Sequence, residues 1–164
     1  MAFDAELEFA DQVGRHFARQ YALPPMTGRV LGWLLVCEPP KQTVAELSEA
    51  LRASRSAVSS AVSTLESWSF VQRSRPAGER VDLITLHPAL WQQSFDSPVE
   101  YAAIGALARH GLEALGDEPP ARRGRLLEMA AYSDFLMERM PPLGAEWRAR
   151  RDALRASGEL PEDS

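Results

Sequence analysis

The sequence predicts a mainly α fold with a small β wing, arranged as a winged helix-turn-helix. First, Thr43 and Glu46 stand three residues apart as a capping-box pair, which marks the start of a helix. Second, an apolar stripe at the spacing of one helical face predicts a further helix, and its members are Val58, Ala61, Val62 and Leu65. Third, two β-prone segments, 70–75 and 81–86, flank a Pro-Ala-Gly turn typical of a hairpin. The ordered set predicts the fold more strongly than any single piece.

Two helices are expected before this motif. Apolar residues on one face predict the first over residues 4–19, namely Phe3, Leu7, Ala10, Val13 and Phe17. The second is expected over residues 26–37 and ends before Pro39-Pro40, because the residue before a proline disfavours helical geometry. Gly28 and Gly32 lie on one face of it, at a cost of about 1 kcal/mol each in helix propensity. Either another element packs closely there or the helix is loosely formed.

The second helix of the motif has a hydroxyl-rich outer face. Ser54 is expected to cap it after the short connection from Arg52. The face opposite the apolar stripe carries Arg55, Ser56, Ser59, Ser60, Ser63 and Thr64. Serine is a mediocre helix former, but short hydroxyls let a helix lie close to the wall of a DNA groove and donate to phosphates and base edges. The alternative is a serine-rich surface helix without a binding role.

The hairpin carries three arginines, Arg73, Arg75 and Arg80, and Arg80 directly follows the turn. A guanidinium at a hairpin tip can enter the narrow minor groove of A·T-rich DNA, where the negative potential is concentrated. The segment 41–43 is expected to supply a small first strand that pairs with the hairpin. Thr43 completes the expected DNA-binding set, because it stands at the start of the motif.

The C-terminal part is expected to be helical and to form a dimer. One helix is predicted over residues 104–115, and Pro119-Pro120 precedes another over residues 122–140 that is apolar nearly all round. A helix that is apolar on every side must be buried on two sides, and in a small protein the second side is another subunit. Pro141-Pro142 is expected to end this helix, before a last one over residues 147–154. The predicted interface comprises Phe3, Leu7, Leu126, Met129, Phe135, Leu136 and Met140.

The charge is unevenly distributed along the 164 residues. The net charge is −5, yet residues 41–87 carry six Lys or Arg against five Asp or Glu, and the remainder carries twelve against eighteen. A DNA-binding tip on an acidic body therefore predicts strongly salt-dependent binding. The single cysteine, the acidic N-terminus and the absence of an apolar run of about 20 residues predict a cytoplasmic protein that neither crosses nor binds a membrane.

Enzyme chemistry has no support in the sequence. It contains no glycine-rich nucleotide loop, zinc-ligand spacing or hydrolase elbow, so neither a cofactor nor a metal is expected. His16, His87 and His110 stand far apart, in different predicted elements. Cys37 has no basic neighbour in sequence, which favours a structural thiol over a redox sensor.

The stretch from Thr27 to Arg80 resembles the MarR superfamily of bacterial winged-helix regulators, particularly its GbsR-like branch. The resemblance is carried, in the family's order, by Gly28-Arg29, Gly32, Pro39-Pro40, Glu46-Leu47, Ser54, Val58-Ser59 and Gly78-Glu79-Arg80. It implies a homodimer joined through terminal helices, with two recognition helices on a pseudo-palindrome. Ser69 stands where the family usually has glycine after the recognition helix, which implies a helix end without glycine.

GbsR-like relatives are associated with choline-type ligands, which aromatic cages bind. Trp33, Tyr101 and Tyr132 are the candidate effector contacts, although aromatics at helical spacing more often form core and dimer packing. We therefore expect a dimeric DNA-binding regulator, a repressor rather than an activator, with a possible small-molecule effector. Its expected parts are an N-terminal dimerisation helix (1–22), the winged helix-turn-helix (23–92) and a C-terminal dimerisation region (93–164). The alternative is a winged-helix module that binds a protein partner instead of DNA.

Overall fold

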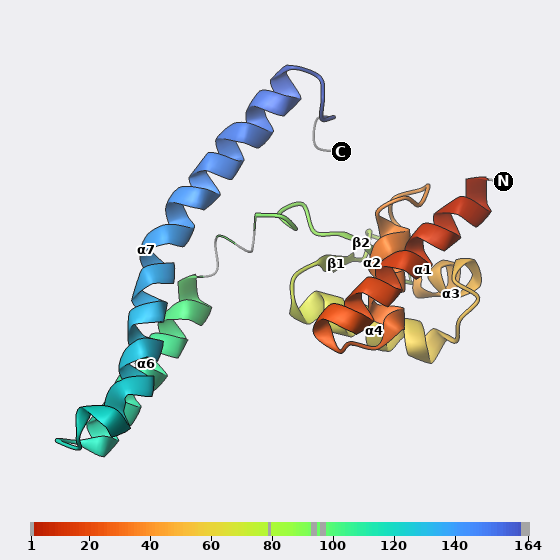
Figure 1. Cartoon of the computed structure of the whole chain (residues 1–164). Coiled ribbons are helices and arrows are strands. Elements are labelled where there is room, and N and C mark those ends of the chain that lie inside the picture. Colours follow the sequence, from red (N-terminus) through yellow and green to blue (C-terminus); the bar gives the residue numbers. More distant parts are fainter. Residues whose placement is uncertain (1, 79, 93–94, 96–97, 162–164) are drawn as a thin grey trace. The chain divides into compact units, whose positions relative to one another are not determined.

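The computed structural model describes residues 2–78, 80–92, 95 and 98–161 (Figure 1). The chain divides into two compact units, Met1–Leu90 and Trp91–Ser164, and each is described by itself. Three sequence features lie partly outside the described residues: Glu79 at the hairpin tip, the linker residues 93–94 and 96–97, and the end of the acidic tail.

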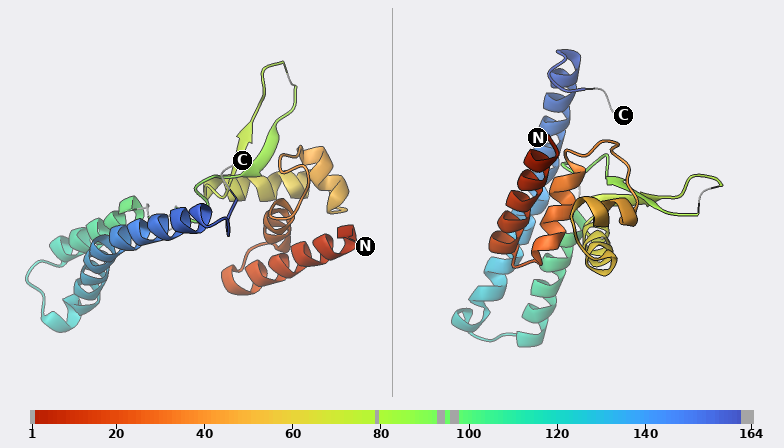
Figure 2. Two further views of the ribbon diagram at one scale, coloured as in Figure 1. Left: turned by 90° about the horizontal axis from the view of Figure 1, so that it is seen from above. Right: turned by 90° about the vertical axis from the view of Figure 1, so that its right-hand side faces the viewer.

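The N-terminal unit is a winged helix-turn-helix. Four helices, α1 (Ala2–Tyr21), α2 (Pro25–Leu34), α3 (Val44–Ala50) and α4 (Arg55–Ser67), precede the strands β1 (Val71–Ser74) and β2 (Leu83–Leu86). The strands pair antiparallel, with registers from Val71 opposite Leu86 to Ser74 opposite Leu83. The hairpin projects from the helices as a wing (Figure 2). At the base of the wing, Gln42 pairs with Ile84 of β2. The strand predicted over residues 41–43 is therefore a single β-bridge.

The core of this unit lies between α2, α3, α4 and β2. Fully buried side chains include Val30, Leu47, Leu51 and Ile84, together with the α4 stripe Val58, Ala61, Val62 and Leu65 at 0–3% exposure. The stripe predicted from sequence therefore faces inward and sets which face of α4 remains free. Helix α2 ends at Leu34, three residues before the predicted end, and Val36 and Cys37 donate from their backbone to Trp33 instead.

Helices α1 and α2 pack closely through glycines. A Cβ atom at Gly28 would lie 2.7 Å from the carbonyl oxygen of Val13 and 2.8 Å from Gly14 Cα. A Cβ at Gly32 would lie 2.9 Å from Ala10 Cα. These contacts are with the backbone of α1, which cannot rotate away as a side chain can. The close packing expected at the two glycines is confirmed, and the loosely formed helix is excluded.

Helix α4 ends without glycine, as the sequence implied. Ser69 has φ +56°, and its N–H donates to Glu66 O while that of Phe70 donates to Leu65 O, each at 2.8 Å. This pair of bonds is the Schellman motif, which usually places glycine at the residue with positive φ. Arg52, with φ +50°, ends α3 in the same way. A serine here costs about 1 kcal/mol relative to glycine and still turns the chain into β1.

The C-terminal unit is a pair of helices, α6 (Pro98–Leu115) and α7 (Pro120–Ala156), joined by a short turn. Ser133 Oγ donates to Tyr101 O at 2.6 Å, next to Gly105, where the helices approach closely. Arg109 Nη1 also pairs with Asp134 Oδ1 at 3.2 Å. None of the described helices is long and apolar enough to cross a membrane.

The prediction that Pro141-Pro142 ends a helix is wrong. Helix α7 continues through both prolines to Ala156, and it includes the segment 147–154 expected as a separate helix. Figure 2 shows the axis of α7 bending part-way along its length. Proline removes one hydrogen bond and crowds the preceding turn, which favours a bend over a break when helix-forming residues such as Met, Leu, Glu and Arg lie on both sides.

The glycine packing predicts a position-specific loss of stability. Gly28→Ala places a methyl group against the backbone of α1 and should lower the free energy of unfolding by about 1–3 kcal/mol. Gly124→Ala is the matched control, because a Cβ there meets nothing within 4 Å. On helix propensity alone it should raise stability by about 0.5–1 kcal/mol. Urea unfolding monitored by circular dichroism measures both; equal stability of the Gly28 variant and the wild type would contradict the packing.

Candidate nucleic-acid interface

The free face of α4 presents hydroxyl groups. Ser54 Oγ accepts from the N–H of Ala57 at 3.2 Å, which confirms the predicted cap. Ser56, Ser60 and Ser63 are exposed, whereas Ser59 is half-buried. Thr64 is also half-buried and donates to the carbonyl of Ser60 at 3.1 Å, so its hydroxyl proton is used within the helix. The three exposed serines are therefore the hydroxyls best placed to reach a ligand.

The start of α3 is fixed by the predicted capping box. Thr43 Oγ1 accepts from the N–H of Glu46 at 3.2 Å, and Glu46 Oε2 accepts from the N–H of Thr43 at 2.7 Å. The bonds from the backbone and the hydroxyl of Thr43 hold the pKa of the Glu46 carboxyl below its usual value. Thr43 is therefore engaged in the cap and sets where α3 begins.

Two of the wing arginines are held by carboxylates. Arg73 Nε lies 2.7 Å from Glu66 Oε2, at the end of α4, and Arg75 Nε lies 2.8 Å from Asp82 Oδ1 across the wing. The bond from Arg75 holds the pKa of the Asp82 carboxyl below its usual value. Arg80 is exposed and makes no ion pair with any residue that the structure describes. Its guanidinium is the wing cation most available to an external anion.

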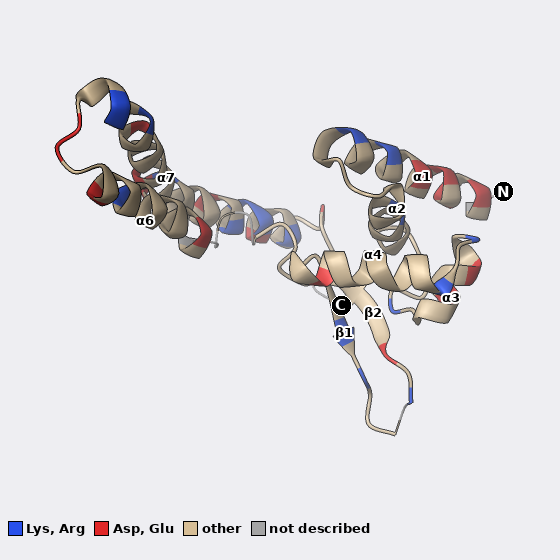
Figure 3. Ribbon diagram, turned by 90° about the horizontal axis from the view of Figure 1, so that it is seen from below, with Lys and Arg blue, Asp and Glu red and all other residues tan. Residues whose placement is uncertain are grey.

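These elements enclose an open hollow of about 340 Å³ between α3, the start of α4 and the wing. Its lining combines four arginines with one aspartate, and consists of Thr43, Val44, Ala45, Arg55, Arg73, Arg75, Arg80, Val81 and Asp82. Figure 3 shows basic segments along the wing, while α4 is largely uncharged. The structure thus brings together the predicted residues Thr43, Arg55, Arg73, Arg75 and Arg80 around one concavity.

This arrangement suits a polyanion with a grooved surface. Guanidinium groups bind phosphates with paired hydrogen bonds, and a neutral helix with short side chains can approach base edges closely. Two of the four arginines are partly neutralised by Glu66 and Asp82, which limits indiscriminate attraction. The acidic partners were missed from sequence, since Glu66 and Arg73 stand seven residues apart in different elements. For the Arg75–Asp82 pair, the opposite charges on the two sides of the turn could have predicted the contact from the sequence.

The predicted dimer residues lie on two different surfaces. Phe135 on α7 is 57% exposed, while Leu126, Met129, Leu136 and Met140 are half-buried. Phe3 and Leu7 on α1 lie in the N-terminal unit, where Phe3 packs edge-to-face on Trp33 with ring centroids 5.4 Å apart and Leu7 packs on the core. Helices α6 and α7 leave further large apolar side chains exposed, namely Val99, Leu107, Leu127, Tyr132, Met137 and Leu143. Within the described residues of the C-terminal unit, this apolar surface is not covered.

The three candidate effector residues are divided between the units. Trp33 is 4% exposed, and its indole N–H donates to Gln42 Oε1 at 2.9 Å inside the N-terminal core. Tyr101 lies on α6 and is half-buried, and Tyr132 on α7 is exposed. Within each unit, they do not form an aromatic cage of their own.

The remaining candidate groups show no catalytic arrangement. Burial raises the pKa of the Cys37 thiol, which donates to Pro39 O at 3.4 Å, and this supports the structural interpretation. Within the described part of the chain, no group of three or more His, Cys, Asp or Glu is placed to hold a metal ion.

Comparison with known proteins assigns the family. The model of the MarR family matches residues 23–80, and that of the MmpR5-like MarR family transcriptional regulators matches residues 89–150. The chain is 39% identical over 124 residues to the HTH-type transcriptional regulator MmpR5 of Mycobacterium tuberculosis, which covers 75% of this chain and 74% of that protein. A crystal structure of a transcriptional regulator superposes with a TM-score of 0.80 at 33% identity, covering 88% of this chain and 99% of the other.

The four helices and the two-stranded wing together define a winged helix-turn-helix protein. The chain belongs to the MarR family of transcriptional regulators. This family consists of regulators and not enzymes, in agreement with the sequence prediction. The predicted superfamily and fold class are confirmed. The C-terminal match is to the MmpR5-like group, and the GbsR-like branch is not confirmed.

Proposed function

We propose that this protein is a homodimeric, sequence-specific DNA-binding repressor that acts on pseudo-palindromic operators. The observation that carries the proposal is the hollow in which Arg55, Arg73, Arg75 and Arg80 converge beside the exposed serines of α4. A concavity of this charge matches a phosphate backbone, and the neutral helix beside it matches a groove. The branch within the superfamily stays a prediction, and the matches favour the MmpR5-like group over the GbsR-like one.

In this proposal, α4 lies in the major groove. Ser56, Ser60 and Ser63 face the base edges, with the half-buried Ser59 and Thr64 at the margins of the same face. A hydroxyl donates or accepts, so it suits several base edges and selects by its position. Arg55 at the start of α4, with the capped Thr43 beside it, lies toward the flanking phosphates.

The wing approaches the adjacent minor groove. Arg80 is free of the ion pairs that hold Arg73 and Arg75, so it can insert without first breaking one. Arg73 and Arg75 keep their carboxylate partners and offer their remaining N–H groups to phosphates. Favourable insertion of an arginine requires a narrow minor groove, so A·T-rich flanks are expected next to each half-site.

Dimerisation is required for specificity. MarR regulators act as dimers, and this chain leaves apolar side chains of α6 and α7 exposed. We propose that Leu126, Met129, Phe135, Leu136 and Met140 join Phe3 and Leu7 of the N-terminal helix in an isologous interface. A dimer on a palindrome would cover the DNA that the polymerase needs, which makes repression the expected outcome. In that role the protein works in the cytoplasm, where the DNA is.

Release by a small-molecule effector remains part of the proposal. Of its predicted contacts Trp33, Tyr101 and Tyr132, Trp33 is buried in the N-terminal core, so this part of the proposal rests on the half-buried Tyr101 and the exposed ring of Tyr132. Aromatic side chains of this kind bind apolar or cationic ligands.

Selection of duplexes from random DNA, followed by fluorescence anisotropy at 50 and 200 mM salt, tests the proposal. A specific regulator should enrich a near-palindrome and lose about 10³–10⁵ in affinity over this range if it makes six to ten phosphate contacts. A winged-helix module that binds a protein would enrich no sequence. That result would favour the alternative function.

Arg80 is expected to contribute through the minor groove. Arg80→Ala should weaken binding to the selected duplex by about 1–3 kcal/mol and leave the circular-dichroism spectrum unchanged. Arg150→Ala, an exposed arginine on α7, removes the same charge outside the hollow and is the matched control. Equal affinities of the two variants at moderate salt would show that Arg80 acts only through net charge or not at all.

The dimer interface predicts a loss of DNA binding without any contact to DNA. Phe135→Arg would bury an unpaired charge in the interface, at a cost of about 3–5 kcal/mol. Sedimentation at low micromolar concentration should show a dimer for the wild type and a monomer or unfolded chain for the variant. Glu146→Arg places an arginine at an exposed position of the same helix, outside the predicted interface, and should remain dimeric although it reverses the charge there. A monomeric wild type would refute the interface.

A further inference from the structure

Gln42 makes one of the attachments of the wing to the rest of the N-terminal unit, beside the buried side chains of Val71 and Ile84 and the Arg73–Glu66 ion pair. The N–H of Gln42 donates to Ile84 O at 3.0 Å, and the N–H of Ile84 donates to Gln42 O at 2.7 Å. These two bonds form a single bridge and not a strand, so they resist sliding and twisting less than a ladder would. Thr85 Oγ1 adds one exposed bond to Pro40 O at 3.2 Å.

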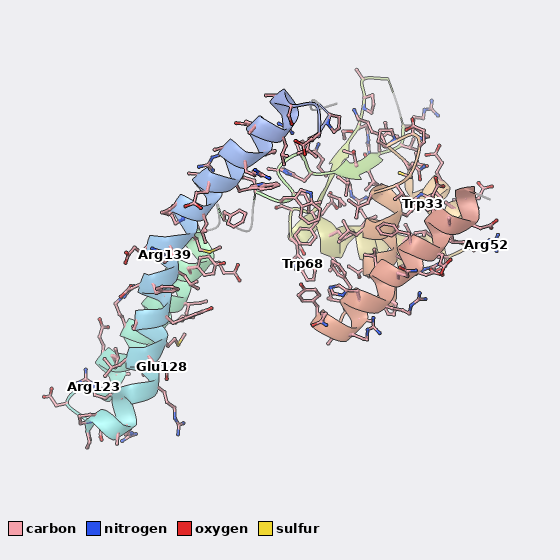
Figure 4. All side chains as sticks on the ribbon, turned by 45° about the horizontal axis from the view of Figure 1, so that its top comes forward. Trp33, Arg52, Trp68, Arg123, Glu128 and Arg139 are labelled. Carbon is pink, nitrogen blue, oxygen red and sulfur yellow. The ribbon has the colours of Figure 1, made fainter. Side chains whose placement is uncertain are left out.

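The side chain of Gln42 supplies a second attachment, to α2. It is buried, with 6% exposure, and its Oε1 accepts from Trp33 Nε1 at 2.9 Å. Trp33, which is labelled in Figure 4, also makes a T-shaped contact with Phe3 of α1, with the ring centroids 5.4 Å apart. One residue thus joins the base of the wing, through its backbone, to the helical core, through its side chain. Burial discourages the loss of this bond, because an unpaired amide oxygen would remain out of water.

The position of the wing tip depends strongly on the angle at which the base of the wing is held. Arg80 precedes Ile84 by four residues and lies nearer the tip of the wing, at a distance of about 13 Å if the chain between them is extended. A tilt of about 10° at the base would then move the tip by about 2 Å, more than a hydrogen bond tolerates. Thr43, which follows Gln42 directly, caps α3 at the hollow, so the same segment also positions that edge of the surface.

We propose that Gln42 is a positioning residue for DNA recognition: its bond to Trp33 sets the angle of the wing to α4 and thereby the place of Arg80 on the DNA. Gln42 itself is buried and acts only through the wing. The inference rests on the proposed DNA-binding function. It adds to that function a residue that does not itself contact DNA. The alternative is that the bond contributes only to stability.

A double substitution separates the two roles. Trp33→Phe alone leaves the Gln42 oxygen unpaired, whereas Trp33→Phe with Gln42→Met replaces both partners by apolar groups, and methionine matches glutamine in shape. The double variant should therefore recover the part of the stability loss that comes from the unpaired oxygen, while the loss from the smaller aromatic ring is common to both variants. Val30→Ala is the control: it shortens a fully buried side chain of α2 but keeps the Trp33–Gln42 bond.

We expect the double variant to bind the selected duplex about tenfold more weakly than the wild type, within the range for loss of a groove contact. In an Arg80→Ala background, it should weaken binding by less than about twofold further, because both changes remove the same contact. The Val30→Ala variant should be less stable and yet bind normally at a temperature where it is folded. Hydrogen exchange of the Ile84 amide, which is bonded to Gln42 O, should accelerate in the double variant and not in the control, relative to the other core amides.

Two results would overturn the inference while the proposed function stands. One is a double variant that binds the selected duplex as tightly as the wild type. The other is a loss of binding free energy in the double variant that adds fully to the loss caused by Arg80→Ala. If the wild-type protein selects no duplex, the proposed function fails instead. The exchange measurement then still decides about the wing: unchanged exchange at Ile84 overturns the inference, and selective acceleration supports the role of Gln42 in positioning the wing.

Discussion

The burial of one stripe of α4 is the constraint on which the rest of the structure depends. Val58, Val62 and Leu65 are completely buried. Burying each such side chain contributes about 1.5–3 kcal/mol, so the helix cannot rotate about its axis without losing most of the core. The serines are therefore held outward, and the positive-φ turn at Ser69 directs the chain into β1. The wing then returns its arginines to the edge of the same helix, where the hollow forms.

The balance of acidic and basic residues affects DNA binding separately from the shape of the hollow. The acidic chain would repel DNA at long range, and only local arginines offset this. Glu66 and Asp82 reduce that local charge further, but they order Arg73 and Arg75 before any ligand arrives. Exposed ion pairs contribute little to stability, so a role in orienting the side chains explains them better. In the proposed mode of binding, such a surface favours binding that depends on fit, because the neutral hydroxyls and the guanidinium groups of Arg55 and Arg80, which lie outside these ion pairs, must coincide with the groove.

The sequence predicts features that local chemistry determines, and it predicts poorly those that depend on packing. The capping box at Thr43, the cap at Ser54 and the apolar stripe of α4 all follow from residues within about two helical turns of each other. The glycine contacts of α1 and α2 were foreseen as an option, since glycine has a cost that packing must offset. The effect of Pro141-Pro142 was misjudged because the local preference against helix is weaker than the tendency of both flanks to form one helix. The Trp33–Gln42 bond was missed. Trp33 lies on α2 and Gln42 lies after the Pro39-Pro40 turn, and no local sequence pattern relates the two residues.

Dimethyl sulfate footprinting on the selected duplex tests the central claim most directly, because it reports guanine N7 in the major groove and adenine N3 in the minor groove. The claim is that two copies of α4 occupy successive major grooves with the wings in the flanking minor grooves. The account predicts two related protected regions whose centres are separated by about one helical turn, roughly 34 Å, each with minor-groove protection on its outer side. Protection of a single region, or of the minor groove alone, would contradict it.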